Sequence, residues 1–197
     1  MSEKKRIRRE PAETRTLILD ATEALMRTEG YAAVSTRRVA KEAGLTASLV
    51  HYYYPETDNL FVDLHRRMTE RQVAELGQIL GCGDPVTALW EYQAGWAQSA
   101  LGVEFIALAN HRKTIKPLIA VRTEEARDVQ AAALAGALER AGVDSAVLPP
   151  EALAMMLVGI ARTLANEERV GITRGHAEVR GFVDWLLAWL RDGNSLT

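Results

Sequence analysis

Apolar residues recur at steps of three and four along most of the chain, a spacing that predicts amphipathic helices. The first helix is expected over residues 14–29, and Gly30 follows its last apolar position. Its apolar face consists of Leu17, Ile18, Ala21, Leu25 and Met26. The sequence shows neither the period-two alternation typical of strands nor an internal repeat. The hydrophobic pattern therefore predicts an all-α fold.

Residues 35–54 have the pattern of two short helices separated by a tight turn. Ser35 or Thr36 can cap the first helix, because a hydroxyl oxygen accepts a free backbone N–H at a helix start. Gly44 follows the last apolar position of that helix, where a left-handed backbone costs glycine little, and Thr46 can cap the second helix. Such a pair is a helix-turn-helix, whose second helix reads base edges in the DNA major groove.

Longer helices are expected in the rest of the chain. One begins at a cap formed by Thr57 or Asp58 and ends near Leu80, before the Gly- and Pro-containing break at residues 81–85. The others are expected over residues 86–102, 103–111, 115–141, 151–168 and 176–192. The last two have apolar stripes wide enough for two contact surfaces, so they need either a deeply buried position in a monomer or a partner chain.

The run from Thr36 to Leu60 resembles the DNA-binding motif of the TetR (tetracycline-repressor) family of bacterial transcription regulators. The resemblance is carried by Arg37-Arg38, Val39-Ala40, Ala43-Gly44-Leu45 and the aromatic run 51–54 before Pro55. It is specific over residues 14–65. It implies an N-terminal three-helix helix-turn-helix domain with a basic arm, residues 1–55, followed by a helical ligand-binding and dimerisation domain, residues 56–197.

The expected DNA contacts lie at the start of the first motif helix and along the second. Arg37 and Arg38 suit phosphates, and Arg38 could instead reach a guanine. The second helix begins with uncharged residues that offer hydroxyl contacts and apolar contacts to thymine methyls, and its ring side chains offer donors to phosphates. The expected set is Thr36, Arg37, Arg38, Thr46, Ala47, Ser48, Leu49, His51, Tyr52 and Tyr53. Thr57 stands where the family usually has a lysine, and Tyr54 stands at a phenylalanine position for which core packing is favoured.

The resemblance also implies a homodimer through residues 151–192, where the last two helices of two subunits form a four-helix bundle. It further implies an unknown small-molecule ligand in the second domain. The candidate ligand-binding residues are large apolar side chains of the central helices, each of which could also be ordinary core: Met68, Trp90, Trp96, Phe105, Leu108, Met155 and Met156. Few charges fall on the inward stripes, with Glu104, Asn110 and His111 the nearest polar groups, so a largely apolar ligand is expected.

Charge and motif content favour a DNA-binding regulator over an enzyme. The net charge is −2, but residues 1–54 carry a balance of +3 and the remainder −5. The basic arm carries Lys4, Lys5, Arg6, Arg8 and Arg9, which suit phosphates or the minor groove, or form a solvated tail. No metal-ligand spacing, phosphate-binding loop or nucleophile motif occurs, so no cofactor, metal site or catalytic residue is expected. His51 and His65 are expected to be polar contacts or surface groups.

Cys82 is the only cysteine, which excludes an intrachain disulfide and favours a reducing compartment. An inert loop residue and a redox switch are both compatible with it. The N-terminus has no secretory pattern, and no apolar run reaches the roughly 20 residues of a membrane helix, so a cytoplasmic protein is expected. The leading hypothesis is a dimeric repressor that a small, largely apolar ligand releases from its operator. The alternatives are a helical small-molecule-binding protein and a ligand-independent regulator or activator.

Overall fold

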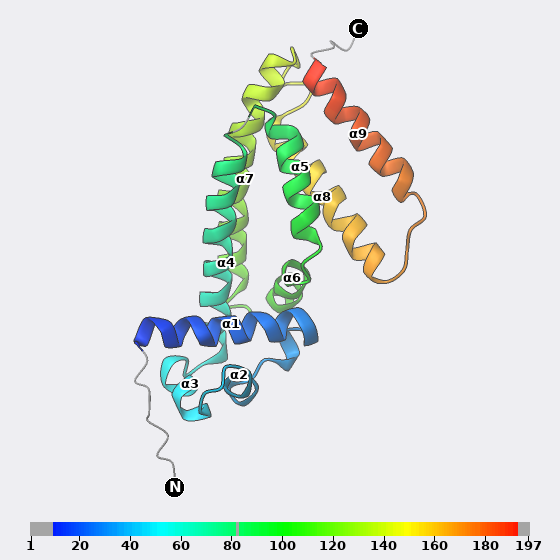
Figure 1. Cartoon of the computed structure of the whole chain (residues 1–197). Coiled ribbons are helices and arrows are strands. Elements are labelled where there is room, and N and C mark those ends of the chain that lie inside the picture. The colour runs from blue at the N-terminus through cyan, green and yellow to red at the C-terminus, as the bar shows by residue number, and fades with distance from the viewer. Residues whose placement is uncertain (1–9, 82, 193–197) are drawn as a thin grey trace. The chain divides into compact units, whose positions relative to one another are not determined.

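The computed structural model describes residues 10–81 and 83–192 of the chain. Throughout these residues the regular structure is helical, which confirms the all-α prediction. The elements in Figure 1 are α1 (Pro11–Glu29), the short 3-10 turn η1 (Tyr31–Ala33), α2 (Thr36–Glu42), α3 (Ala47–Tyr53), α4 (Thr57–Ile79), α5 (Pro85–Ala97), α6 (Leu101–His111), α7 (Lys116–Arg140), α8 (Pro150–Arg169) and α9 (His176–Asp192).

Packing divides these helices into two compact units. The first takes in the chain up to Arg67 together with Ala100–Ile119, and the second takes in Met68–Ser99 and the chain from Ala120 onward. The helix α4 therefore continues from the first unit into the second, and α6 packs against α1 and η1 of the first unit. The assignment of DNA binding to residues 1–55 and of ligand binding and dimerisation to residues 56–197 remains a prediction about function.

The local structure of the helix-turn-helix follows from its caps and its glycine. The Ser35 side chain accepts a hydrogen bond from the Arg38 N–H, and the Thr46 side chain accepts one from the Leu49 N–H, each at 3.3 Å. Gly44 has a φ of +64°, in the left-handed region that favours glycine. Both predicted cap positions and the turn glycine are therefore confirmed, with Ser35 as the cap of α2.

The predicted helix boundaries around α5 and α6 are wrong by several residues. A single helix was expected over residues 86–102, but α5 ends at Ala97 and α6 begins at Leu101. The Ser99 N–H bonds the Trp96 carbonyl at 2.9 Å in a tight turn, and the Arg169 guanidinium donates to the Ala97 carbonyl at 2.5 Å. The last carbonyls of α5 thus find partners outside the helix, and one partner lies in α8, far along the sequence.

The start of α4 also differs from the expectation. Thr57 is the first residue of α4, so Thr57 and Asp58 both lie in its first turn and not before it. Asp58 accepts hydrogen bonds from Arg112 and, at 2.7 Å, from the Thr114 hydroxyl. The carboxylate therefore ties the start of α4 to the segment that follows α6.

The first unit is built around α1, which packs against α2 and α6, while α2 packs against α3. Its core is formed by apolar side chains that are almost entirely inaccessible, among them Ile18, Met26, Val39, Val50, Phe61 and Leu64. Burial of such side chains is the main source of stability for so small a helical unit. The predicted apolar face of α1 is therefore largely confirmed as core.

The second unit has a leucine-rich core of its own. Its largest cluster combines residues of α4, α5, α7, α8 and α9, among them Leu89, Leu134, Leu157, Val183, Leu186 and Leu187. The helices α5 and α8 pack closely along each other. None of the helices in the described ranges is both long and apolar enough to cross a lipid bilayer.

Candidate DNA-binding surface and ligand-binding unit

The helix α3 buries one side chain and exposes most of the others. Val50 is in the core, whereas Ala47, Ser48, Leu49, His51 and Tyr52 are exposed, and Tyr52 has 78% of its surface accessible. The Thr46 and Ser48 hydroxyls lie 3.1 Å apart at the N-terminal end of the helix. This capped end therefore offers hydroxyl groups without a formal charge, as expected for a helix that approaches DNA bases and phosphates.

The two arginines of α2 differ in their surroundings. Arg37 is exposed, and within the described residues it has no hydrogen bond or ion pair. Arg38 is paired with Glu29 at the end of α1, with the guanidinium 2.5 Å from the carboxylate. Both side chains of this pair are nearly half accessible, so the ion pair is weak and can be exchanged for a phosphate. Thr36 is half-buried in the first turn of the same helix.

Tyr53 has a basic neighbour that sequence reasoning missed. The guanidinium carbon of Arg15 in α1 lies 5.3 Å from the centre of the Tyr53 ring, within the range of a cation–π contact. The Tyr52 and Tyr53 rings also meet edge to face, 5.4 Å apart. Arg15 stands on the solvent side of α1 in the hydrophobic pattern, and no local signal connects it to a tyrosine 38 positions later.

Tyr54 is a core residue with a polar anchor, as favoured from the sequence. It is 4% accessible, and its hydroxyl donates to Asp63 of α4 at 3.1 Å. Burial and the Asp63 charge both oppose formation of a phenolate, so the pKa of Tyr54 rises to about 12. The tyrosine therefore holds the end of α3 against α4 and is unavailable to DNA.

Polar contacts attach α6 and the residue after it to the turn before the helix-turn-helix and to the start of α4. The Tyr31 N–H donates to Glu104 Oε2 at 2.7 Å, and the Tyr31 ring stacks on His111 at 6.3 Å. Arg112, just after α6, pairs with Asp58. Hydrogen bonds from Thr114 and Arg112 hold the pKa of Asp58 below its ordinary value, although burial acts in the opposite direction.

His65 is buried, so of the two roles expected for it a surface position is wrong. Its side chain is 4% accessible, and its ring lies edge-on against Phe105 of α6, 4.9 Å away. Its position directly after Leu64 gave no sign of burial, because Phe105 of α6 lies far along the sequence. His51 is exposed on α3.

The candidate ligand-binding residues are divided between the two units and differ in their burial. Phe105 and Leu108 are fully buried in the first unit. The second unit contains the remaining five, of which Met68 is buried, Trp90 and Trp96 are half-buried, and Met155 and Met156 are exposed on α8. Only Trp90 is packed against both apolar clusters of the second unit. The polar groups singled out from the sequence belong to the first unit, and Glu104 bonds Tyr31 there.

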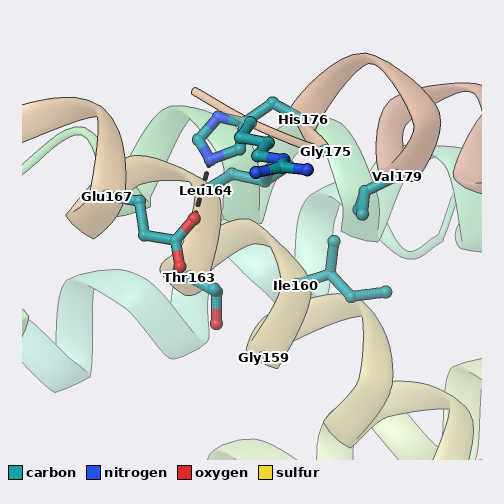
Figure 2. Close-up of a pocket in the computed structure, with 9 residues that line it drawn as sticks. Gly159, Ile160, Thr163, Leu164, Glu167, Gly175, His176 and Val179 are labelled. Carbon is teal, nitrogen blue, oxygen red and sulfur yellow. Dashed lines mark hydrogen bonds and ion pairs between the residues drawn. The ribbon is translucent and has the colours of Figure 1, made fainter. Parts of the chain in front are cut away.

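A groove of about 400 Å³ lies between α8 and α9 (Figure 2). One end of it contains a hydrogen bond of 2.8 Å between His176 Nε2 and Glu167 Oε2. Arg180 donates to Glu168 nearby and holds the pKa of that carboxyl below its ordinary value. The rest of the lining is formed by Gly159, Ile160, Thr163, Leu164, Arg174, Gly175 and Val179.

Exposed aromatic side chains follow the same α9 helix. Phe182 and Trp185 are each about half accessible, and their rings lie 5.7 Å apart. Trp185 also stacks on Trp189 at 6.3 Å. By contrast, Leu186 and Leu187 on the adjacent face are buried in the core of the second unit. The wide apolar stripe predicted for this helix therefore has an inner face and an outer face.

Two sequence predictions lie outside the described residues. The basic arm with Lys4, Lys5, Arg6, Arg8 and Arg9 is one, and Cys82 is the other. In the part of the chain that the structure describes, no group of three His, Cys, Asp or Glu side chains could hold a metal ion.

A capped helix-turn-helix with an exposed second helix, on an all-helical chain with a separate C-terminal unit, defines the class of helix-turn-helix DNA-binding regulators. Residues 18–64 match the model of the bacterial regulatory proteins of the tetR family. Over residues 18–64 the chain is therefore similar to the regulatory proteins of this family.

Several solved structures share the fold over nearly the whole chain. A TetR transcription regulator from Haloarcula marismortui has a TM-score of 0.71 at 20% identity and covers 88% of this chain and 95% of its own. FadR from Bacillus subtilis in complex with stearoyl-CoA has a TM-score of 0.64 at 12% identity, over 91% and 99%. A regulator from Saccharomonospora viridis in complex with choline has a TM-score of 0.64 at 20% identity, over 92% and 95%. No curated protein matches the chain.

Proposed function

We propose that the protein is a dimeric transcription regulator, most simply a repressor, that leaves its operator when a small molecule binds its second unit. The observation that carries the proposal is the exposed polar face of α3 on a correctly capped helix-turn-helix. Such a protein acts on chromosomal DNA, so we place it in the cytoplasm.

The DNA contact that we propose combines α2 and α3. Arg37 and Arg38 bind phosphates beside the groove, while Thr46, Ala47, Ser48 and Leu49 approach base edges at the N-terminal end of α3. His51, Tyr52 and Tyr53 add donors to phosphates, together with Thr36. Arg15 joins this set because its guanidinium lies over the Tyr53 ring, and Arg38 exchanges its Glu29 partner for a phosphate on binding.

The dimer that we propose forms through residues 151–192. Phe182 and Trp185 of α9 and Met155 and Met156 of α8 are all exposed. Exposed aromatic clusters of this kind mark association surfaces, because covering them removes apolar area from water. A twofold partner also supplies the second DNA-reading helix that a single helix-turn-helix lacks.

The ligand that we propose is a small, largely apolar molecule held in the second unit by Met68, Trp90 and Trp96. Two proteins of the same fold were solved in complex with stearoyl-CoA and with choline, which supports a small-molecule ligand for this chain as well. We assign Phe105 and Leu108 to the attachment of α6, since both are fully buried in the first unit. Met155 and Met156 belong to the proposed dimer surface.

Coupling between ligand and DNA runs through α6 in this proposal. Only residues 98–100 separate α5 of the second unit from α6 of the first. A ligand that displaces α5 would therefore pull on α6, which holds Tyr31 through Glu104 and Asp58 through Arg112. Ligand and operator then disfavour each other by a coupling free energy of about 1–3 kcal/mol, which is reciprocal by linkage.

Selection of bound DNA from a random pool tests the proposal. A dimer should enrich a site with two half-sites related by twofold symmetry, about one helical turn apart or a multiple of it. The position of the site relative to the promoter then separates repression from activation. Enrichment of no site, or of a single isolated half-site, would contradict the dimeric regulator. A ligand that raises the melting temperature without changing operator affinity would contradict the coupling.

A further inference from the structure

Two large side chains stand out on the exposed side of α3. Leu49 has 36% of its surface accessible and Tyr52 has 78%, whereas Val50, on the inner side of the helix, has 1%. Leu49 precedes Tyr52 by three positions, so the two side chains are neighbours on the helix surface. In the proposed complex this helix lies in the major groove, so the Leu49 side chain and the Tyr52 ring face base edges.

The other side chains of α3 offer little that distinguishes one base from another. Guanine is usually recognised by arginine or lysine, adenine by asparagine or glutamine, and cytosine by aspartate or glutamate. The helix contains none of these six residue types over Ala47–Tyr53. Its Ser48 hydroxyl and its His51 ring can each form a hydrogen bond with more than one base. The base-specific feature left for α3 to recognise is therefore the thymine methyl group, which takes an apolar contact.

A contact with α1 helps to hold the exposed tyrosine in place. The Tyr52 ring meets the Tyr53 ring edge to face at 5.4 Å, and the guanidinium carbon of Arg15 lies 5.3 Å from the centre of the Tyr53 ring. Tyr53 is half-buried and follows Leu49 by four positions, so it is a neighbour of Leu49 as well. A side chain that is ordered before binding loses less conformational entropy when it binds. The free protein therefore already presents Leu49 and the Tyr52 ring together.

We propose that Leu49 and the Tyr52 ring bind a thymine methyl group in each half-site of the operator, so that a T·A base pair is selected there through its methyl group. The phosphate contacts proposed for Arg37 and Arg38 position the helix but carry no sequence information. The Tyr52 hydroxyl stays available to a phosphate, because the methyl contact uses only the ring. This inference rests on the proposed function and specifies the class of DNA sequence that α3 reads.

Base analogues that remove a single methyl group test the inference on the wild-type, full-length protein. The probe is the duplex that the protein enriches from a random pool, with its thymines replaced one position at a time by deoxyuridine. At the contacted position, replacement in one half-site should weaken binding about fourfold and replacement in both about sixteenfold, because burial of one methyl-sized group is worth about the first factor. Replacement of a thymine between the half-sites should leave the affinity unchanged.

Cytosine derivatives separate the methyl group from the rest of the base. A C·G pair at the contacted position lacks the methyl group, and 5-methylcytosine restores it beside different hydrogen-bonding groups. The 5-methylcytosine duplex should therefore bind about fourfold more tightly than the cytosine duplex. Fluorescence anisotropy titrations measure all of these affinities at one salt concentration, since phosphate contacts make each affinity depend on salt.

Substitutions assign the methyl contact to the two side chains, which are exposed, so that the variants should stay folded. Leu49→Ala should bind the thymine and deoxyuridine duplexes with similar affinity, because the contact that distinguishes them is lost. Tyr52→Ala should reduce the difference, while Tyr52→Phe keeps the ring and should retain it. Ser48→Ala, on the same side of α3, is the matched control and should keep the wild-type preference for thymine.

Three results would overturn the inference: half-sites without a T·A pair, deoxyuridine duplexes that bind like thymine duplexes at every position, or a Leu49→Ala protein with the wild-type preference for thymine. If a twofold-symmetric duplex is enriched and its methyl groups have no effect, only the methyl contact fails and the regulator proposal stands. Enrichment of no duplex at all would overturn the regulator proposal, and the methyl contact with it.

Discussion

The backbone N–H of Tyr31 donates to Glu104 Oε2 at 2.7 Å, across 73 positions of sequence. This bond joins α6 to the turn that leads into the helix-turn-helix. Gly30, the preceding residue, has a φ of +83°, and a Cβ atom there would lie 3.1 Å from the same carboxylate oxygen. The glycine therefore allows both the backbone conformation and the close approach of Glu104.

Removal of the Glu104 carboxylate should destabilise the first unit. Glu104→Ala leaves the Tyr31 N–H without its partner, which should lower the free energy of unfolding by about 1–2 kcal/mol. Glu104→Gln is the matched control, since its amide oxygen can still accept the bond and most of the stability should remain. Urea unfolding followed by circular dichroism measures both. Equal stability of the Ala and Gln variants would show that this bond contributes little.

The α2 arginines should account for part of the salt dependence of operator binding. The double variant Arg37→Ala, Arg38→Ala should bind the selected operator more weakly and flatten the plot of log affinity against log salt by up to about two units of slope. Arg140→Ala removes a charge from α7 and should leave both quantities unchanged. Gel-shift titrations at several salt concentrations provide the comparison. An unchanged slope in the double variant would move the DNA-binding surface elsewhere.

Charge on the outer face of α9 should separate the two subunits. Trp185→Glu places a carboxylate in the proposed interface at a side chain that is 54% accessible in the single chain, so the monomer should stay folded. Light scattering should then report the monomer mass, with unchanged helical circular dichroism. Ala177→Glu, at an exposed position in the first turn of α9, should remain dimeric.

Leu186→Glu provides the contrast to this substitution. Leu186 is only 8% accessible and belongs to the core of the second unit, so a carboxylate there should unfold the unit and not merely dissociate it. A Trp185→Glu protein that is still a dimer would place the interface outside this face.

The Asp58 contacts should make stability depend on acid. The pKa of this carboxyl is below its ordinary value of 3.8, chiefly because Thr114 and Arg112 donate to it. A lowered pKa in the folded state means that the contribution to stability is present above pH 3.8 and is lost as the pH falls through the lowered pKa. The stability difference between wild type and Asp58→Asn should therefore shrink on acidification.

Urea unfolding from neutral pH to about pH 3 measures this difference. Asp184→Asn, at an exposed position of α9, serves as control and should show no such pH dependence relative to wild type. A gap between wild type and Asp58→Asn that stays constant with pH would show that the Asp58 ion pair does not stabilise the fold.

Much of the DNA-binding domain could be predicted from the sequence, because its determinants are local. The caps Ser35 and Thr46 and the left-handed Gly44 act on backbone groups within a few positions, so their residue types were sufficient to predict α2, the turn and α3. The same locality explains why the exposed face of α3 was recognisable. Whether its side chains bind DNA as expected is still a prediction.

The tertiary structure alone decided the remaining features, because they depend on partners distant in sequence. His65 is packed against Phe105 of α6, and the last turn of α5 accepts a hydrogen bond from Arg169 of α8. The burial of Leu186 in the core of the second unit distinguishes the inner face of α9 from its outer face. On separate amphipathic helices such positions look ordinary, because the residues that bury or pair them lie far along the chain and come together only through packing.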